Sequence, residues 1–190
     1  MAPVLIVPGL NDSGPAHWQT WWQATESGTL RVVQDDWQQP DLGRWSARVA
    51  ESLDQTAGPV WLVAHSFGCL ASVAAVARRP GRIKGALLVA PADPERFGLG
   101  ITFPQRALPF PSIVVASTND PWMRFDRAAQ WAGRWGSRLV NLGRAGHINS
   151  ESGYGPWPKG RALLRELCQR APRTALPPSF DSLHFQEPTL

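Results

Sequence analysis

The chain has 190 residues, of which 43% are hydrophobic and 18% are charged, with a formal net charge of +4. The length suits one domain with a proper core, and the composition excludes an intrinsically disordered chain. The basic residues are scattered without a continuous run, so we expect a mildly basic surface and no nucleic-acid partner.

The amino-terminal segment and the two cysteines indicate where the protein is located and whether it contains a disulfide. No basic region precedes the first apolar run, which stops at Pro8, so this run predicts a strand and not a signal peptide. No segment is long enough to cross a membrane, and we expect a cytoplasmic location. Cys69 and Cys168 have no metal-ligand spacing, so free thiols are favoured, although two cysteines could form a disulfide.

Short β-branched runs alternate with helical patterns along most of the chain. Strands are predicted at Val4–Val7, Arg31–Gln34, Val60–Ala64, Ala86–Ala90, Ile113–Ala116 and Leu139–Leu142. Helices are predicted at Pro15–Ala24, Leu42–Thr56, Phe67–Arg79, Asp126–Trp135 and Lys159–Arg170. This alternation predicts an α/β domain over residues 1–171, with a mostly parallel sheet of about six strands and helices on both faces.

Two stretches do not follow this rhythm. Ala92–Pro111 is rich in proline, glycine and phenylalanine, and such a long connection often forms part of a binding site. Residues 172–190 contain several prolines and little periodicity, so we expect a loosely packed or disordered tail.

Polar residues follow three of the predicted strands in an order that suggests chemistry. Ser66 follows the third strand, Asp120 the fifth and His147 the last. In an open parallel sheet, ligands bind at the carboxyl ends of the strands. The order serine, aspartate, histidine is that of the nucleophile, acid and base of an α/β-hydrolase.

The segment Ala64-His65-Ser66-Phe67-Gly68 is a variant of the nucleophile elbow G-x-S-x-G, with alanine in place of the first glycine. Small residues are needed there because the strand and the helix nearly touch. The amide of Phe67 at the helix start could donate to an oxyanion. We expect the second donor to be the amide of Leu10, or that of Asn11.

Each of these assignments has an alternative. Ser66 could be an ordinary turn serine, and Asp120 could only initiate the turn before Pro121. Asp93 follows the fourth strand and competes as the acid, although strand order favours Asp120. His147 could be a core histidine, but a base needs the reach that its loop provides.

These motifs together resemble a known family of enzymes. The resemblance rests on Val7-Pro8-Gly9-Leu10, Ser13-Gly14, His17-Trp18-Gln19, Ala64-His65-Ser66-Phe67-Gly68, Asn119-Asp120-Pro121 and Gly146-His147-Ile148-Asn149. In this order they are similar to the small serine hydrolases of the bacterial YdeN type, a family that also includes retinoblastoma-binding protein 9. The resemblance covers about residues 3–170.

The resemblance implies a compact α/β-hydrolase without a large lid domain and a triad of Ser66, His147 and Asp120. It also implies hydrolysis of esters or amides, for which no metal and no organic cofactor is needed. The retinoblastoma interaction does not carry over, because neither Cys69 nor Cys168 lies in an L-x-C-x-E segment.

The substrate is expected to be a small-molecule ester or amide, and its identity and the oligomeric state stay open. Candidate pocket residues are Asn11, His17, Trp18, Trp122 and Trp157, with Trp21, Phe97, Phe103 and Phe110 as further aromatic candidates. Any of the tryptophans could instead pack a helix on the sheet. With only a short cap, small or aryl acyl groups are favoured over long lipids. A peptidase or amidase, and a binding protein that has lost catalysis, are the alternatives.

Overall fold

Six parallel strands form one sheet in the computed structural model, which describes residues 2–79, 81–100 and 102–170. The strands are β1 (Val4–Val7), β2 (Thr29–Arg31), β3 (Val60–His65), β4 (Ile83–Val89), β5 (Ser112–Ala116) and β6 (Arg138–Asn141). Their order is β2-β1-β3-β4-β5-β6. The predicted α/β architecture is confirmed, whereas the predicted tail at 172–190 lies outside the described residues.

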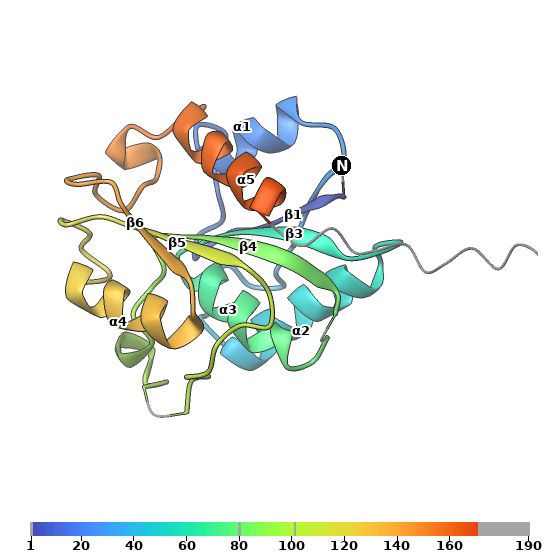
Figure 1. The fold of residues 1–190 in the computed structure, drawn as a ribbon, viewed down its shortest axis with the longest axis horizontal. Coiled ribbons are helices and arrows are strands. Elements are labelled where there is room, and N and C mark those ends of the chain that lie inside the picture. Colours follow the sequence, from blue (N-terminus) through green and yellow to red (C-terminus); the bar gives the residue numbers. More distant parts are fainter. Residues whose placement is uncertain (1, 80, 101, 171–190) are drawn as a thin grey trace, which may run out of the picture.

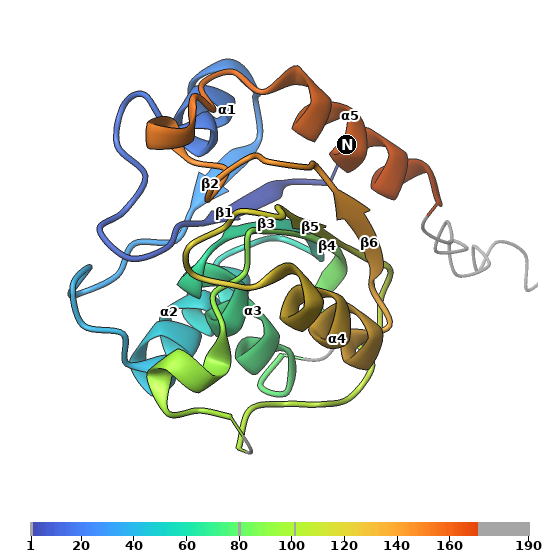
Figure 2. The ribbon, with the colours of Figure 1, turned by 90° about the vertical axis from the view of Figure 1, so that its left-hand side faces the viewer.

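Helices cover both faces of the sheet. They are α1 (Trp18–Thr25), α2 (Leu42–Asp54), α3 (Phe67–Val76), α4 (Phe125–Trp135) and α5 (Pro158–Arg170), with short 3₁₀ turns η1 (Pro94–Phe97) and η2 (Ser150–Ser152). Figures 1 and 2 show α1 and α5 on one face and α2, α3 and α4 on the other. This arrangement follows from parallel connections, since each crossover helix must cover one face of the sheet.

Each face of the sheet has its own apolar core. Trp45, Leu70 and Trp131 belong to the core beneath α2, α3 and α4. Trp18 and Trp22 belong to the core beneath α1 and α5. All six residues of β3 are buried, because this central strand is covered on both sides.

The second strand lies earlier in the chain than Arg31–Gln34, the range that the sequence predicts. β2 pairs only with β1, in the register Val4 with Thr29, and the ladder ends where the Val32 amide donates to the Ile6 carbonyl at 2.9 Å. Val33 is 57% exposed, so the two valines that favoured a later strand lie past its end. An edge strand is set by its single partner, and this register cannot be read from the strand's own sequence.

Two further expectations can be compared with the described residues. Cys69 and Cys168 are free thiols, as favoured from the sequence, and burial raises the pKa of both. No helix in the described part of the chain is long and apolar enough to span a bilayer.

Candidate active site

Ser66 occupies a strained turn between β3 and α3. Its backbone has φ 54° and ψ −125°, a region that residues with a side chain rarely adopt. A Cβ on Gly68 would lie 2.2 Å from the Pro8 carbonyl oxygen, and a Cβ on Gly9 would lie 2.7 Å from the Ser66 Cβ. Both glycines are therefore required by close approach of the backbone, whereas Ala64 fits inside the strand without exposure.

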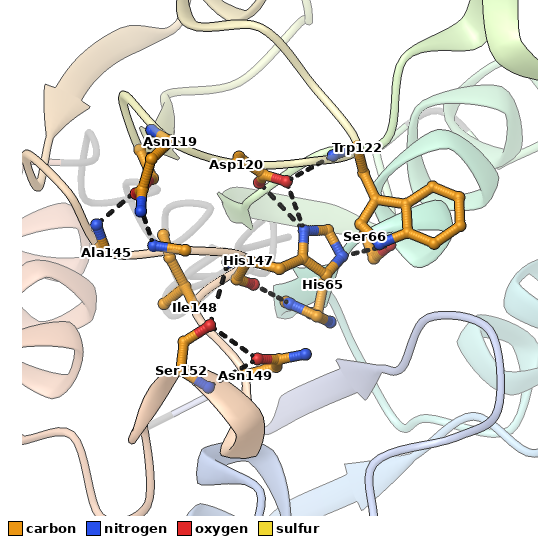
Figure 3. Close-up of polar contacts among 12 residues, drawn as sticks. His65, Ser66, Asn119, Asp120, Trp122, Ala145, His147, Ile148, Asn149 and Ser152 are labelled. Atoms are coloured by element: carbon orange, nitrogen blue, oxygen red, sulfur yellow. Dashed lines mark hydrogen bonds and ion pairs between the residues drawn. The ribbon is translucent and has the colours of Figure 1, made fainter.

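The structure brings three predicted side chains into one hydrogen-bonded chain (Figure 3). The Nε2 atom of His147 lies 2.9 Å from Ser66 Oγ, and its Nδ1 atom lies 2.9 and 3.0 Å from the two carboxylate oxygens of Asp120. An ionised carboxylate can only accept, so with Asp120 ionised the imidazole proton is on Nδ1. Nε2 is then free to accept the hydroxyl proton of Ser66.

Asp120, and not its rival Asp93, faces the histidine. Its side chain is only 2% exposed, and its Oδ1 atom also accepts the Trp122 amide at 2.8 Å. Asp93 instead receives both guanidinium arms of Arg127 at 3.2 Å and accepts from the amide of Glu95 in η1. Strand order therefore selects the carboxylate that the fold aims at His147.

His147 lies in an irregular segment, residues 143–153, which we call the base loop. Side chains that follow β5 hold its start: Ser117 Oγ accepts the Ala145 amide at 3.0 Å, and Asn119 Oδ1 accepts the Gly146 amide at 2.8 Å. Ser117 also donates its hydroxyl to Asn119 Oδ1 at 2.8 Å. The segment that carries Asp120 thus holds the loop that carries the histidine.

The other side of the base loop is fixed by η2. Ser152 Oγ accepts the His147 amide at 3.1 Å and donates to Asn149 Oδ1 at 2.9 Å. Gly146 has φ 57°, and a Cβ there would lie 2.3 Å from Ser152 Oγ. Glycine is required at this position by both conformation and space.

Two backbone amides near Ser66 are the candidate oxyanion donors that the sequence predicts. Among the described residues, the amides of Leu10 and Phe67 donate to no other group. The Asn11 amide, which the sequence left as an alternative to Leu10, donates to the Trp37 carbonyl at 2.9 Å. Leu10 and Phe67 therefore remain as candidate donors, with Phe67 in the first turn of α3.

A cleft of about 390 Å³ opens over the serine. Three of the predicted pocket residues line it: Asn11, His17 and Trp122. Trp122 is 44% exposed and its ring centroid lies 6.3 Å from that of His147, so it forms a rim above the candidate triad. From the long loop, Phe97 also lines the cleft.

The two other predicted pocket tryptophans, Trp18 and Trp157, are not part of this lining. Trp18 is 0% exposed and Trp157 6%, and their rings pack edge to face with centroids 5.0 Å apart. Neither ring lines the cleft as predicted, because packing on the sheet takes both into the core. Phe103 likewise packs edge to face on Trp131, in the opposite core.

A row of three histidines lies beside the cleft. The ring centroids of His17 and His65 are 4.9 Å apart, and those of His65 and His147 are 4.8 Å apart. Burial, together with the nearby Arg31, lowers the pKa of His17 to about 4, and burial holds the pKa of His65 well below its usual value. Two neutral imidazoles therefore lie next to His147 at neutral pH.

Two further buried polar residues, His65 and Gln19, had no predicted role. His65 Nε2 donates to the His147 carbonyl at 2.9 Å, so its hydrogen bond goes to the backbone of the base and not to the Ser66 hydroxyl. Gln19 is fully buried and donates to the carbonyls of Val7 and Val63 at 3.2 and 3.0 Å. Both residues stand inside motifs that carried the family resemblance, which was the available signal.

Away from this cleft, the described residues form further cavities but no cluster of metal-binding side chains. A separate cavity of about 290 Å³ lies by Ala2 and Val4, at the amino-terminal end of β1, and none of the three candidate triad residues lines it. No group of three or more His, Cys, Asp or Glu side chains in the described residues could hold a metal ion.

Known structures share this fold. A protein described as a YdeN-like hydrolase from Pectobacterium atrosepticum has 42% identity and a TM-score of 0.85, over 89% of this chain and 91% of that one. The YdeN gene product of Bacillus subtilis has 20% identity and a TM-score of 0.74, over 90% of this chain and all of that one. Est1E from Butyrivibrio proteoclasticus, solved with ferulic acid, has 14% identity and a TM-score of 0.65, with 90% of each chain covered.

Comparisons of the sequence itself identify the family. A comparison with curated proteins finds no match. The model of the serine hydrolase family matches residues 4–166, which is most of the chain and includes every residue of the candidate triad. With the resemblance to YdeN-like hydrolases, this match shows that the chain belongs to the serine hydrolase family, on an α/β-hydrolase fold.

Proposed function

We propose that the protein hydrolyses a small carboxylic ester or amide through a triad of Ser66, His147 and Asp120. The observation that carries this proposal is the continuous hydrogen-bonded chain from Ser66 Oγ through both imidazole nitrogens to the Asp120 carboxylate. This geometry makes a serine hydroxyl nucleophilic at neutral pH, because a proton acceptor is already in place.

The first half of the reaction is acylation. Ser66 Oγ attacks the carbonyl carbon of the substrate while His147 Nε2 takes the hydroxyl proton. Asp120 keeps the proton of His147 on Nδ1 and stabilises the imidazolium that forms. The amides of Leu10 and Phe67 donate to the oxyanion, and the carbon–oxygen or carbon–nitrogen bond breaks as His147 returns its proton to the leaving group.

The second half is deacylation by water. His147 Nε2 accepts a proton from water, whose oxygen attacks the acyl carbon. The same two amides again hold the oxyanion. Collapse of this intermediate releases the carboxylic acid and returns the proton to Ser66 Oγ, so the enzyme ends each cycle unchanged.

The acyl group is proposed to be short or aromatic. The cleft of about 390 Å³ has Phe97 and the rim tryptophan Trp122 as apolar groups, whereas Asn11, Asn149 and Glu151 give it a polar side. η1 is the only regular element in the long loop after β4 as far as the structure describes it, which leaves little apolar surface for a long chain. A series of aryl esters of increasing acyl length is expected to peak at short chains, and a maximum at long chains would contradict this.

The nucleophile is tested by labelling with a fluorophosphonate probe. Wild type is expected to be labelled and to hydrolyse a short aryl ester, whereas Ser66→Ala should show neither, with turnover reduced by about 10³-fold or more. Ser72→Ala is the matched control, because this buried serine of α3 donates only to the Gly68 carbonyl. A Ser66→Ala enzyme with wild-type turnover would contradict the proposal.

The choice between ester and amide needs a separate comparison. Because the triad would be the same for both, turnover of an ester is compared with that of the amide of the same acid. We expect the ester to be faster. A faster amide would make the protein an amidase or peptidase, and absence of labelling and of both activities would favour a binding protein.

A further inference from the structure

The backbone next to His147 is strained. Ile148 has φ 50°, in the left-handed region, which is unfavourable for a β-branched residue. Such a conformation persists only when the surroundings hold it. Contacts that hold Ile148 therefore also decide where the preceding residue, His147, places its imidazole.

Two buried aromatic side chains hold the carbonyls on either side of Ile148. His65 Nε2 donates to the His147 carbonyl at 2.9 Å, as Figure 3 shows, and Trp18 Nε1 donates to the Ile148 carbonyl at 2.8 Å. His65 is 5% exposed and Trp18 is 0% exposed, so water does not compete for either bond. The donors come from the end of β3 and the start of α1.

His65 is a polar residue at the end of a buried, apolar strand, so it needs a hydrogen-bond partner there. The rest of β3, Val60–Ala64, is apolar and buried, and His65 is the single polar residue in the strand. A buried polar group is costly without a partner, and the His147 carbonyl is the partner that it has. Because His65 directly precedes Ser66, the bond ties the backbone of the base to the turn of the nucleophile.

We propose that His65 and Trp18 are positioning residues, which lock the carbonyls of His147 and Ile148 and thereby hold the imidazole between Asp120 and Ser66. This inference rests on the proposed hydrolase function, since it concerns the base of that reaction. Among the described residues, His65 has no hydrogen bond to Ser66 Oγ or to the acid; its ring also packs beside that of His147, with the centroids 4.8 Å apart. It acts through the backbone of His147, and Trp18 acts one residue further on.

The test compares two replacements of His65. Leucine removes the donor, whereas glutamine can present its Nε2 amide near the position of the imidazole Nε2. With a short aryl ester, His65→Leu is expected to lower kcat about 10- to 100-fold and to change KM by less than about threefold, because misplacement of a catalytic group affects the chemical step. His65→Gln is expected to keep kcat within about fivefold of wild type.

A spectroscopic signal distinguishes positioning from general loss of structure. The low-field proton resonance of the His147 Nδ1–H···Asp120 bond is expected in wild type and in His65→Gln. It should broaden or disappear in His65→Leu. Trp18→Phe, which removes the indole N–H, is expected to lower kcat about 3- to 10-fold in the same direction.

Controls keep the inference separate from folding and from the proposed function. Ser112→Ala, at the start of β5 and away from the site, removes a part-buried hydrogen bond to Ser137 and is expected to leave kcat unchanged. If His65→Leu does not fold, His65→Asn replaces it, since its amide is too short to reach the carbonyl and should lower kcat as leucine does.

Equal kcat in the donor and non-donor variants, whether both high or both low, overturns the positioning role. So does a wild-type resonance in His65→Leu. The proposed function fails by a different result, wild-type turnover in Ser66→Ala, so the two failures are distinguishable.

Discussion

The nucleophile turn and the base loop meet at one hydrogen bond but are built in different ways. The turn at Ser66 is held by contact between backbones, with Gly9 and Gly68 leaving no room for a Cβ. The base loop at His147 is held by side-chain hydrogen bonds that arrive from other elements, including Ser117 and His65. Close packing thus fixes the nucleophile turn, whereas hydrogen bonds fix the base loop.

This difference predicts different responses to mutation. Close packing leaves no way to relax, so damage to the turn should unfold the protein. A network of hydrogen bonds can lose one member and keep the fold, while the group that it aims is displaced. Substitutions in the turn should therefore lower the free energy of unfolding most, and substitutions in the base-loop network should lower kcat most.

The largest effect is expected from Gly68→Ala. The new methyl group would lie 2.2 Å from the Pro8 carbonyl oxygen and 2.5 Å from that of Val7, and neither backbone can move without separating β1 from α3. We expect the free energy of unfolding to fall by about 4 kcal/mol or more, or the chain not to fold. Urea denaturation followed by tryptophan fluorescence measures this.

Gly133→Ala is the matched control for that substitution. Gly133 lies inside α4, and a Cβ there would meet no atom within 4 Å. Alanine is a better helix former, so this variant should gain about 0.5 to 1 kcal/mol. A Gly68→Ala protein as stable as Gly133→Ala would show that the turn is not held by packing.

The buried histidines beside the base loop should make the free energy of unfolding depend on pH. His17 caps α1 and packs beside His65, and its pKa is lowered from 6.5 to about 4 in the folded protein. Below pH 6.5 the unfolded chain therefore binds a proton that the folded chain refuses until about pH 4. Stability is full above pH 6.5, falls as the pH drops towards 4 and then levels off.

His17→Asn tests this linkage. Asparagine keeps a side-chain acceptor for helix capping but does not titrate. Between pH 7 and about 4.5, the wild type should lose about 2 to 3 kcal/mol more of its unfolding free energy than the variant does. The lowered pKa of His65 acts in the same direction and leaves a residual slope in the variant. If the unfolding free energy, measured by urea denaturation, changes with pH equally in wild type and in His17→Asn, His17 does not contribute to the pH dependence.

A smaller effect on stability, but a clear one on turnover, is expected from Asn119→Ala. Its Oδ1 atom accepts the Gly146 amide next to His147, and the side chain is exposed, so water can replace part of the lost bond. We expect kcat to fall about 10-fold and the free energy of unfolding to fall by about 1 kcal/mol.

Asn141→Ala controls for the loss of an exposed asparagine. Asn141 also accepts a glycine amide at 2.8 Å, that of Gly143, but it does so further from His147. A similar small loss of stability with nearly unchanged kcat is expected. Equal losses of kcat in both variants would mean that the network does not aim the base.

The same contrast explains what could be predicted from the sequence. The strand order that placed Ser66, Asp120 and His147 at one edge of the sheet is a local signal, since each residue lies in the short segment that follows an apolar run. The fold class and the family are readable in the same way. The support of the base loop is not local, because its hydrogen-bond partners come from β3, α1 and the segment after β5.

The errors have the same origin. Trp18 and Trp157 suit a pocket or a core equally well by residue type, and only packing on the sheet places them in the core. The bounds of β2 depended on its register with β1. The bond from His65 to the His147 carbonyl joins residues 82 positions apart in the chain, so no local pattern predicts it.

The smallest effect is expected where the sequence departs from the G-x-S-x-G pattern. Ala64→Gly would restore the first glycine in a strand position that is fully buried and paired with Val7 and Leu88. Glycine inside a strand is unfavourable, so the free energy of unfolding should fall by about 0.5 to 1 kcal/mol, with kcat changed by less than about threefold. Urea denaturation and turnover of a short aryl ester measure the two effects. A large gain in kcat would instead show that the Ala64 methyl group distorts the nucleophile turn. Close packing would then position Ser66 less accurately than the hydrogen bonds of the base loop position His147.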